Sequence, residues 1–169
     1  VNLADFETSL LDGCFGAQVL MDVCGDGTPN TIYQPQVISA IVARFPDCIN
    51  VPKRSGGNDA DEGDTVLHYC ARKHRTDAVE RLLPLDGGAV FTPVSNGPAT
   101  LTIGERCYDF DAWTALHEAI KRTNKDITVH LLATLNKNLN KVTSKMVTEA
   151  ITLMALVMPH LVPEALILL

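Results

Sequence analysis

Apolar and polar positions between residues 65 and 88 predict two short helices joined by a tight turn. In residues 65–71 (TVLHYCA), Leu67, Cys70 and Ala71 fall on one narrow apolar face. The polar run KHRT at 73–76 interrupts this pattern, which restarts over 77–83 (DAVERLL) and ends in a Leu-Leu pair. Pro84 and the glycine pair at 87–88 then close the unit.

The same pattern returns about fifty residues later. Residues 114–120 (TALHEAI) match the first motif, and Leu131-Leu132 follow at the distance at which Leu82-Leu83 follow the first copy. A motif that recurs with its downstream partner in register indicates a repeat protein.

Each copy also carries the signals of a helix start. Thr65 and Thr114 are good N-cap residues, because a threonine hydroxyl can accept a backbone N–H of the first turn. His68 and His117 each lie three residues further on, where a side chain can reach back toward the cap as in a capping box. We therefore interpret both histidines as structural residues.

These residues resemble the ankyrin repeat, whose signature is G-x-T-P-L-H-x-A-A followed by V-x-x-L-L. Both copies lack the family's proline after threonine, having Val66 and Ala115, and His74 or Thr123 stands in place of its turn glycine. The matching residues are Gly63, Thr65, Leu67, His68, Ala71, Val79, Leu82 and Leu83 in the first copy, and Thr114, Leu116, His117, Ala119, Leu131 and Leu132 in the second.

The resemblance implies an all-α solenoid of stacked helix-turn-helix units with long inserted loops. Thr114 lies 49 residues after Thr65, whereas the family period is about 33, so we place an insertion of about 16 residues within 86–109. Two units alone bury too little surface. We therefore expect one domain over 1–169, with a degenerate repeat at 1–50, repeats at 61–92 and 109–140, and a degenerate repeat at 141–169.

The flanks carry patterns that support this expectation. Residues 10–24 are apolar and helix-like, and Val37, Ile41 and Val42 have helical spacing within 36–45. At the other end we predict a helix over 146–157 and another that starts at Pro163. Prolines interrupt the apolar stretch 151–169, so we interpret it as a buried final helix pair and not as a membrane span. Because the chain starts at valine and ends on an apolar run, we expect it to be part of a longer polypeptide.

Composition excludes several function classes. The net charge is −6 and no long basic run occurs, which disfavours nucleic-acid binding and a membrane-surface role. The five cysteines include no C-x-x-C pair, so they indicate neither a disulfide framework nor a zinc site, and a cytoplasmic location fits them. No calcium loop, phosphate loop or nucleophile–base–orienter set is found. We expect no cofactor, no metal and no enzymatic activity.

The most informative charges occur at matching positions in the two copies. Arg72-Lys73 and Lys121-Arg122 end the first helix of each unit, where ankyrin stacks face their concave groove. The preceding loops are acidic, at 59–64 and at 109–111. We hypothesise a groove with a basic floor and an acidic rim that binds an acidic or mixed-charge protein segment. The alternative is that these charges only solvate the helix ends and stabilise their dipoles.

Aromatic residues add a second candidate contact. Trp113 is the only tryptophan, and we expect it at the tip of a projecting hairpin beside Tyr108 and Phe110, where aromatics anchor interfaces. Equally, these rings can fold back and cover the inserted loop. The candidate partner-binding residues are Arg72, Lys73, Lys121, Arg122, Trp113, Tyr108, Asp61 and Asp111.

These observations favour a protein–protein interaction module that binds its partner through the concave groove and finger loops. One alternative is the cytosolic ankyrin region of an ion channel or other membrane protein, serving assembly or gating. A second is a substrate-recruiting domain of a multidomain enzyme. Hydrophobic spans of about 20 residues downstream of Leu169 would favour the channel.

Overall fold

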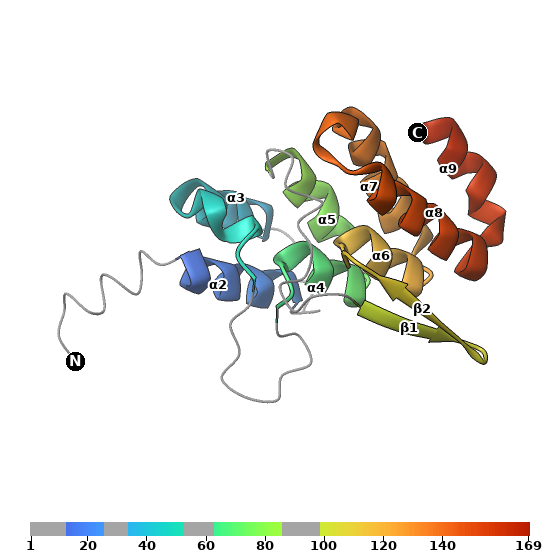
Figure 1. The fold of residues 1–169 in the computed structure, drawn as a ribbon. Helices are drawn as coiled ribbons and strands as arrows, with labels where there is room; N and C mark the ends of the chain where they lie inside the picture. Colours follow the sequence, from blue (N-terminus) through green and yellow to red (C-terminus); the bar gives the residue numbers. More distant parts are fainter. Residues whose placement is uncertain (1–12, 26–33, 53–62, 86–98) are drawn as a thin grey trace.

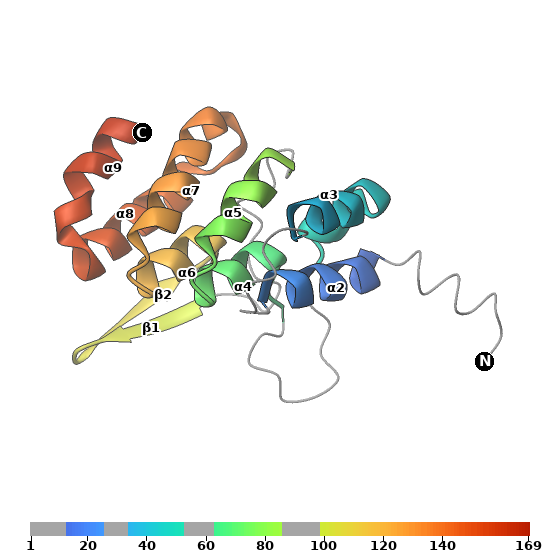
Figure 2. The same ribbon diagram turned by 180° about the vertical axis from the view of Figure 1, so that it is seen from behind.

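The computed structural model describes residues 13–25, 34–52, 63–85 and 99–169. Its helices are arranged in pairs that stack side by side (Figure 1, Figure 2). The first helices of the pairs are α2 (Gly13–Gly25), α4 (Val66–Arg72), α6 (Ala115–Lys121) and α8 (Ser144–Val157). The second helices are α3 (Gln34–Arg44), α5 (Thr76–Leu82), α7 (Lys125–Lys137) and α9 (Val162–Leu168).

Among the described residues, each pair packs mainly on its neighbours in the stack. Along the row of first helices, α2 packs on α4, α4 on α6 and α6 on α8. Along the second row, α3 packs on α5, α5 on α7 and α7 on α9. Short 3₁₀ helices, η1 (Pro46–Ile49), η2 (Leu83–Leu85), η3 (Leu139–Lys141) and η4 (Pro159–Leu161), extend or connect these helices. This is the helical solenoid that the repeat motif predicts.

The core is continuous between the two rows because equivalent positions of successive repeats point inward. Leu67 and Leu116 are buried, and so are Leu82 and Leu131. Cys70 is fully buried, as expected for a small hydrophobic residue whose counterpart is an alanine. The apolar face read from the sequence is therefore the face that the repeats bury against one another.

The turn inside each central repeat uses left-handed backbone. His74 has a φ of 56° and Thr123 a φ of 55°. These are the positions at which the ankyrin signature has glycine, the residue that adopts such a φ without steric cost. A β-branched threonine in this region is strained.

Part of the predicted insertion is a β-hairpin and not a loop. β1 (Ala99–Ile103) pairs antiparallel with β2 (Arg106–Phe110). Threonine alternates with other side chains in β1, and Gly104 begins a two-residue turn with a φ of 62°, which are hairpin signals. The rest of the insertion, 86–98, lies outside the described residues.

Two further expectations need correction. Val37 is exposed, because the core side of α3 is set by Ile38 and Val42, which lie one turn apart. The last helix is also less buried than predicted: Leu166 is 62% and Ile167 is 86% exposed. α9 packs on α7 and α8 through one side only, and no described element covers the other. None of the described helices is long and apolar enough to cross a membrane.

Candidate functional site

The start of each central repeat is closed by a threonine–histidine capping box. In the first, the backbone N–H of Thr65 donates to Nδ1 of His68 at 3.3 Å, and the hydroxyl lies 2.8 Å from the same nitrogen. In the second, the corresponding distances between Thr114 and His117 are 3.2 and 2.8 Å. The capping role predicted for both histidines is confirmed.

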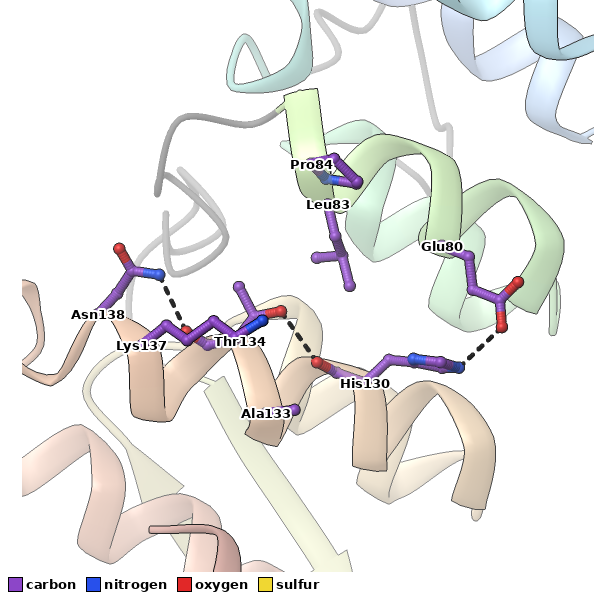
Figure 3. A pocket seen from close by; sticks show the side chains of 8 residues that line it. All are labelled: Glu80, Leu83, Pro84, His130, Ala133, Thr134, Lys137 and Asn138. Atoms are coloured by element: carbon purple, nitrogen blue, oxygen red, sulfur yellow. Dashed lines mark hydrogen bonds and ion pairs between the residues drawn. The ribbon is translucent and has the colours of Figure 1, made fainter.

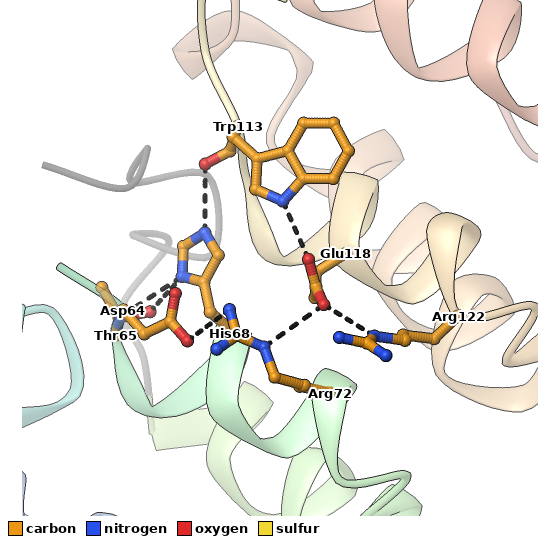
Figure 4. Close-up of polar contacts among 7 residues, drawn as sticks. All are labelled: Asp64, Thr65, His68, Arg72, Trp113, Glu118 and Arg122. Atoms are coloured by element: carbon orange, nitrogen blue, oxygen red, sulfur yellow. Dashed lines mark hydrogen bonds and ion pairs between the residues drawn. The ribbon is translucent and has the colours of Figure 1, made fainter. Parts of the chain in front are cut away.

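His68 also joins one repeat to the next. Because its Nδ1 accepts from the backbone of Thr65, its Nε2 carries the proton, and it donates to the carbonyl oxygen of Trp113 at 3.1 Å (Figure 4). The equivalent Nε2 of His117 is buried and has no hydrogen-bond partner among the described residues.

Both histidines are neutral in the folded protein at pH 7. Burial lowers the pKa of His68 from 6.5 to about 4, although its hydrogen bond to the Trp113 carbonyl acts in the other direction. Burial likewise lowers the pKa of His117 to about 4, and the nearby His68 adds to the effect. Near His68 the charges of Glu118 and Arg72 act on its pKa in opposite directions, so the loss of water around a charged imidazole dominates.

Glu118 is the acidic centre of the site and is only 2% exposed. Its carboxylate accepts from Nε of Arg122 at 2.9 Å, from Nε1 of Trp113 at 3.0 Å and from Nε of Arg72 at 3.3 Å. Arg72 also forms an ion pair with Asp64, in which Nη2 lies 2.7 Å from Oδ2. Burial opposes ionisation of Glu118, but the bonds from Arg122 and Trp113 and the charge of Arg72 outweigh it, so its pKa lies below the ordinary value.

The four basic residues predicted from the repeat register therefore divide into two kinds. Arg72 and Arg122 come together on Glu118, from α4 and from the end of α6 (Figure 4). Lys73 and Lys121 are exposed and lie over aromatic rings, with Nζ 5.6 Å from the ring centre of Tyr69 and 5.5 Å from that of Trp113.

The aromatic residues occupy a different place from the one expected. Trp113 lies at the base of the hairpin and not at its tip, and it is 7% exposed. Its ring centre lies 5.4 Å from that of Phe110 and 5.5 Å from that of His117, so the indole covers the start of α6. Tyr108 is half-buried within β2. Of the two interpretations of these rings, folding back describes the position of Trp113.

The remaining candidates, Asp111 and Asp61, belong to the acidic rim that the sequence predicts. Asp111 is exposed and forms an ion pair with Lys145 of α8. Asp61 lies outside the described residues. Sequence reasoning missed Glu118, because its counterpart in the other copy is Tyr69 and the repeat pattern does not mark it. Its only signal is a spacing of four residues to Arg122 on one helix.

A cavity of about 470 Å³ lies on the opposite side, between α5 and α7 (Figure 3). Its polar groups already bond to one another: Nε2 of His130 lies 2.9 Å from Glu80, and the Thr134 hydroxyl donates to the His130 carbonyl. This leaves few groups to orient a ligand. In the described ranges, no three His, Cys, Asp or Glu side chains gather as a metal site would require.

Comparison with known families gives one match. The family model for ankyrin repeats (3 copies) matches residues 20–143. No curated protein and no solved structure matches the chain. The match begins at residue 20 and ends at residue 143, so the division of the flanks into degenerate repeats at 1–50 and 141–169 stays a prediction. Repeats of this kind are generally protein–protein interaction modules and are typically not enzymes. The chain belongs to the ankyrin-repeat family.

Proposed function

We propose that this protein binds an acidic or mixed-charge segment of a partner protein on the exposed side of α4 and α6. We name this surface the basic face and define it by Arg72, Lys73, Lys121 and Arg122. The observation that carries the proposal is an asymmetry of burial. The basic residues reach the surface, whereas Asp64 and Glu118, which pair with the two arginines, lie beneath it.

The charges differ in depth as well as in sign. Asp64 and Glu118 are each 2% exposed, whereas the side chain of Arg122 is 42% exposed. Lys73 and Lys121 are exposed too. A partner that approaches this face therefore meets cationic groups first, because the carboxylates are already held from below. Such a surface attracts carboxylates and repels like charge.

The two lysines are also held in place before a partner arrives. Each ammonium lies over an aromatic ring, Lys73 over Tyr69 and Lys121 over Trp113. A cation held by a ring loses less conformational freedom when it binds. Asp111 and Lys145 form an ion pair with each other, so these two charges largely cancel.

A peptide selection tests this proposal without knowledge of the natural partner. The immobilised protein is used to select from a library of random peptides of about 12 residues at a salt concentration of about 0.15 M. The selected peptides should be enriched in Asp and Glu. Their affinity should fall about tenfold or more for the double variant Lys73→Glu/Lys121→Glu, which leaves the Glu118 ion pairs intact.

The matched control, Arg81→Glu combined with Lys137→Glu, makes the same change of charge at two exposed positions of α5 and α7, in the other row of helices. It should bind the selected peptides like the unchanged protein, apart from a small effect of net charge. Selection of neutral or basic peptides would contradict the proposal. Equal binding by the double variant and the control would contradict it as well.

A further inference from the structure

The β-hairpin has one edge that lacks the usual protection of an edge strand. β1 (ATLTI) has no charged residue, no proline and no bulge over its five residues. Proteins generally protect exposed edges with such features, because an open row of N–H and C=O groups pairs readily with another strand. β2 carries Arg106 and Asp109. No third strand pairs with β1 among the described residues.

The register shows which backbone groups the open edge of β1 presents. Ile103 and Arg106 flank the two-residue turn, so they form the pair that exchanges both hydrogen bonds. This type of pair alternates along a hairpin. The residues between, Thr100 and Thr102, therefore point their N–H and C=O groups away from β2 and toward the open edge.

The two faces of β1 also differ. Ala99, Leu101 and Ile103 are half-buried against the core, whereas Thr100 and Thr102 are exposed. A strand that pairs with β1 must place apolar side chains beside Leu101 and Ile103 and small polar side chains beside the threonines. The sequence of β1 itself has this pattern.

We propose that β1 pairs antiparallel with β1 of a second copy of the chain, about a twofold axis at Leu101. In this register Thr100 lies opposite the partner's Thr102, and both have outward-pointing backbone groups, so they form hydrogen-bonded pairs. Leu101 meets the partner's Leu101, and Ala99 meets the partner's Ile103, all on the apolar face. Contacts of this kind are isologous, so the assembly closes at two copies.

As far as the described residues are concerned, the position of the hairpin leaves this edge accessible. The hairpin projects beyond the helices, with β2 on the side of α6 and α8 and β1 along its outer margin (Figure 1, Figure 2). A few backbone bonds must offset the loss of freedom on association and the repulsion between copies of net charge −6. The dimer is therefore weak and depends on concentration.

Sedimentation velocity of the full chain over roughly 10 to 500 µM tests the dimer. The average mass should rise toward twice that of one chain. The variant Thr102→Pro should remain monomeric, because proline removes an outward N–H of β1 while the bonds within the hairpin stay intact. Its matched control, Cys107→Pro, changes the residue opposite on β2 and should dimerise normally. A monomeric unchanged protein, or equal behaviour of the two variants, would overturn the proposal.

A disulfide trap tests the register and does not depend on the folding of a proline variant. In a Cys107→Ser background, Leu101→Cys should form a covalent dimer on mild oxidation, because a non-hydrogen-bonded pair has Cα atoms about 4.5 Å apart. Ala99→Cys alone should not, but it should cross-link when mixed with Ile103→Cys. Equal trapping at positions 99 and 101, or binding of foreign extended peptides by a chain that stays monomeric, would overturn the proposal.

Discussion

The imidazole of His68 closes its own helix start with Nδ1 and bonds the carbonyl of Trp113 in the next repeat with Nε2. One side chain therefore carries both a local and an inter-repeat function. His117 has the same local function, but its Nε2 has no partner among the described residues. This difference separates two residues that are equivalent in the sequence.

The first prediction follows from that difference. His68→Ala should lower the free energy of unfolding by about 1–2 kcal/mol more than His117→Ala, because it also leaves the Trp113 carbonyl without its donor. Both variants lose a capping box, which costs about 1 kcal/mol. Urea unfolding followed by circular dichroism measures the two values. Equal losses would show that the inter-repeat bond contributes nothing.

The second prediction concerns pH. The pKa values of His68 and His117 are lowered from 6.5 to about 4 on folding. Between these two pKa values the unfolded chain binds protons that the folded protein does not. The contribution of the two histidines to the free energy of unfolding is therefore fully present above pH 6.5 and is lost as the pH is lowered toward 4. Each histidine contributes up to about 1.4 kcal/mol per pH unit.

The variant His117→Gln isolates one of these two contributions. Glutamine at this position retains a side chain that reaches back to the cap, but it does not titrate. Urea unfolding between about pH 7.5 and pH 5 should show a slope reduced by about one proton for the variant. An unchanged slope would mean that His117 is protonated equally in the folded and unfolded chains.

The third prediction concerns the turn at Thr123. Its φ of 55° is strained for a β-branched residue, so Thr123→Gly should raise the free energy of unfolding by about 0.5–1 kcal/mol. The matched control is Thr148→Gly in the exposed middle of α8, where glycine should lower it by a few tenths of a kcal/mol. Thermal and urea unfolding of both variants provide the check. A loss of stability in both would contradict the strain argument.

The fourth prediction concerns the buried carboxylate. Glu118→Ala should destabilise the protein by about 2–3 kcal/mol, because Arg72, Arg122 and the Trp113 indole all lose the hydrogen bond that they donate to this carboxylate. Glu80→Ala removes an exposed contact between the Glu80 carboxylate and Nε2 of His130 and should change stability by less than about 1 kcal/mol. Tryptophan fluorescence should report the first change directly, because Trp113 is the only tryptophan.

Local signals in the sequence determined the repeats of this protein. Thr65 and His68 recur at Thr114 and His117, and a capping box depends only on residues within one helical turn. The helical spacing of apolar positions likewise marks the buried face, because helix geometry fixes which residues share a side. The ankyrin fold and the role of both histidines could therefore be predicted.

Contacts between segments far apart in the chain were decided only by the tertiary structure. The arginine pair on Glu118 joins residue 72 to residue 118, and no repeat position relates them. The same holds for Trp113. From the sequence we expect it at the tip of a hairpin, whereas in the structure it is buried at the base of the hairpin, because its ring packs on Phe110 and His117 there. Periodicity describes what each element buries, whereas the depth and partner of a charge depend on which elements meet.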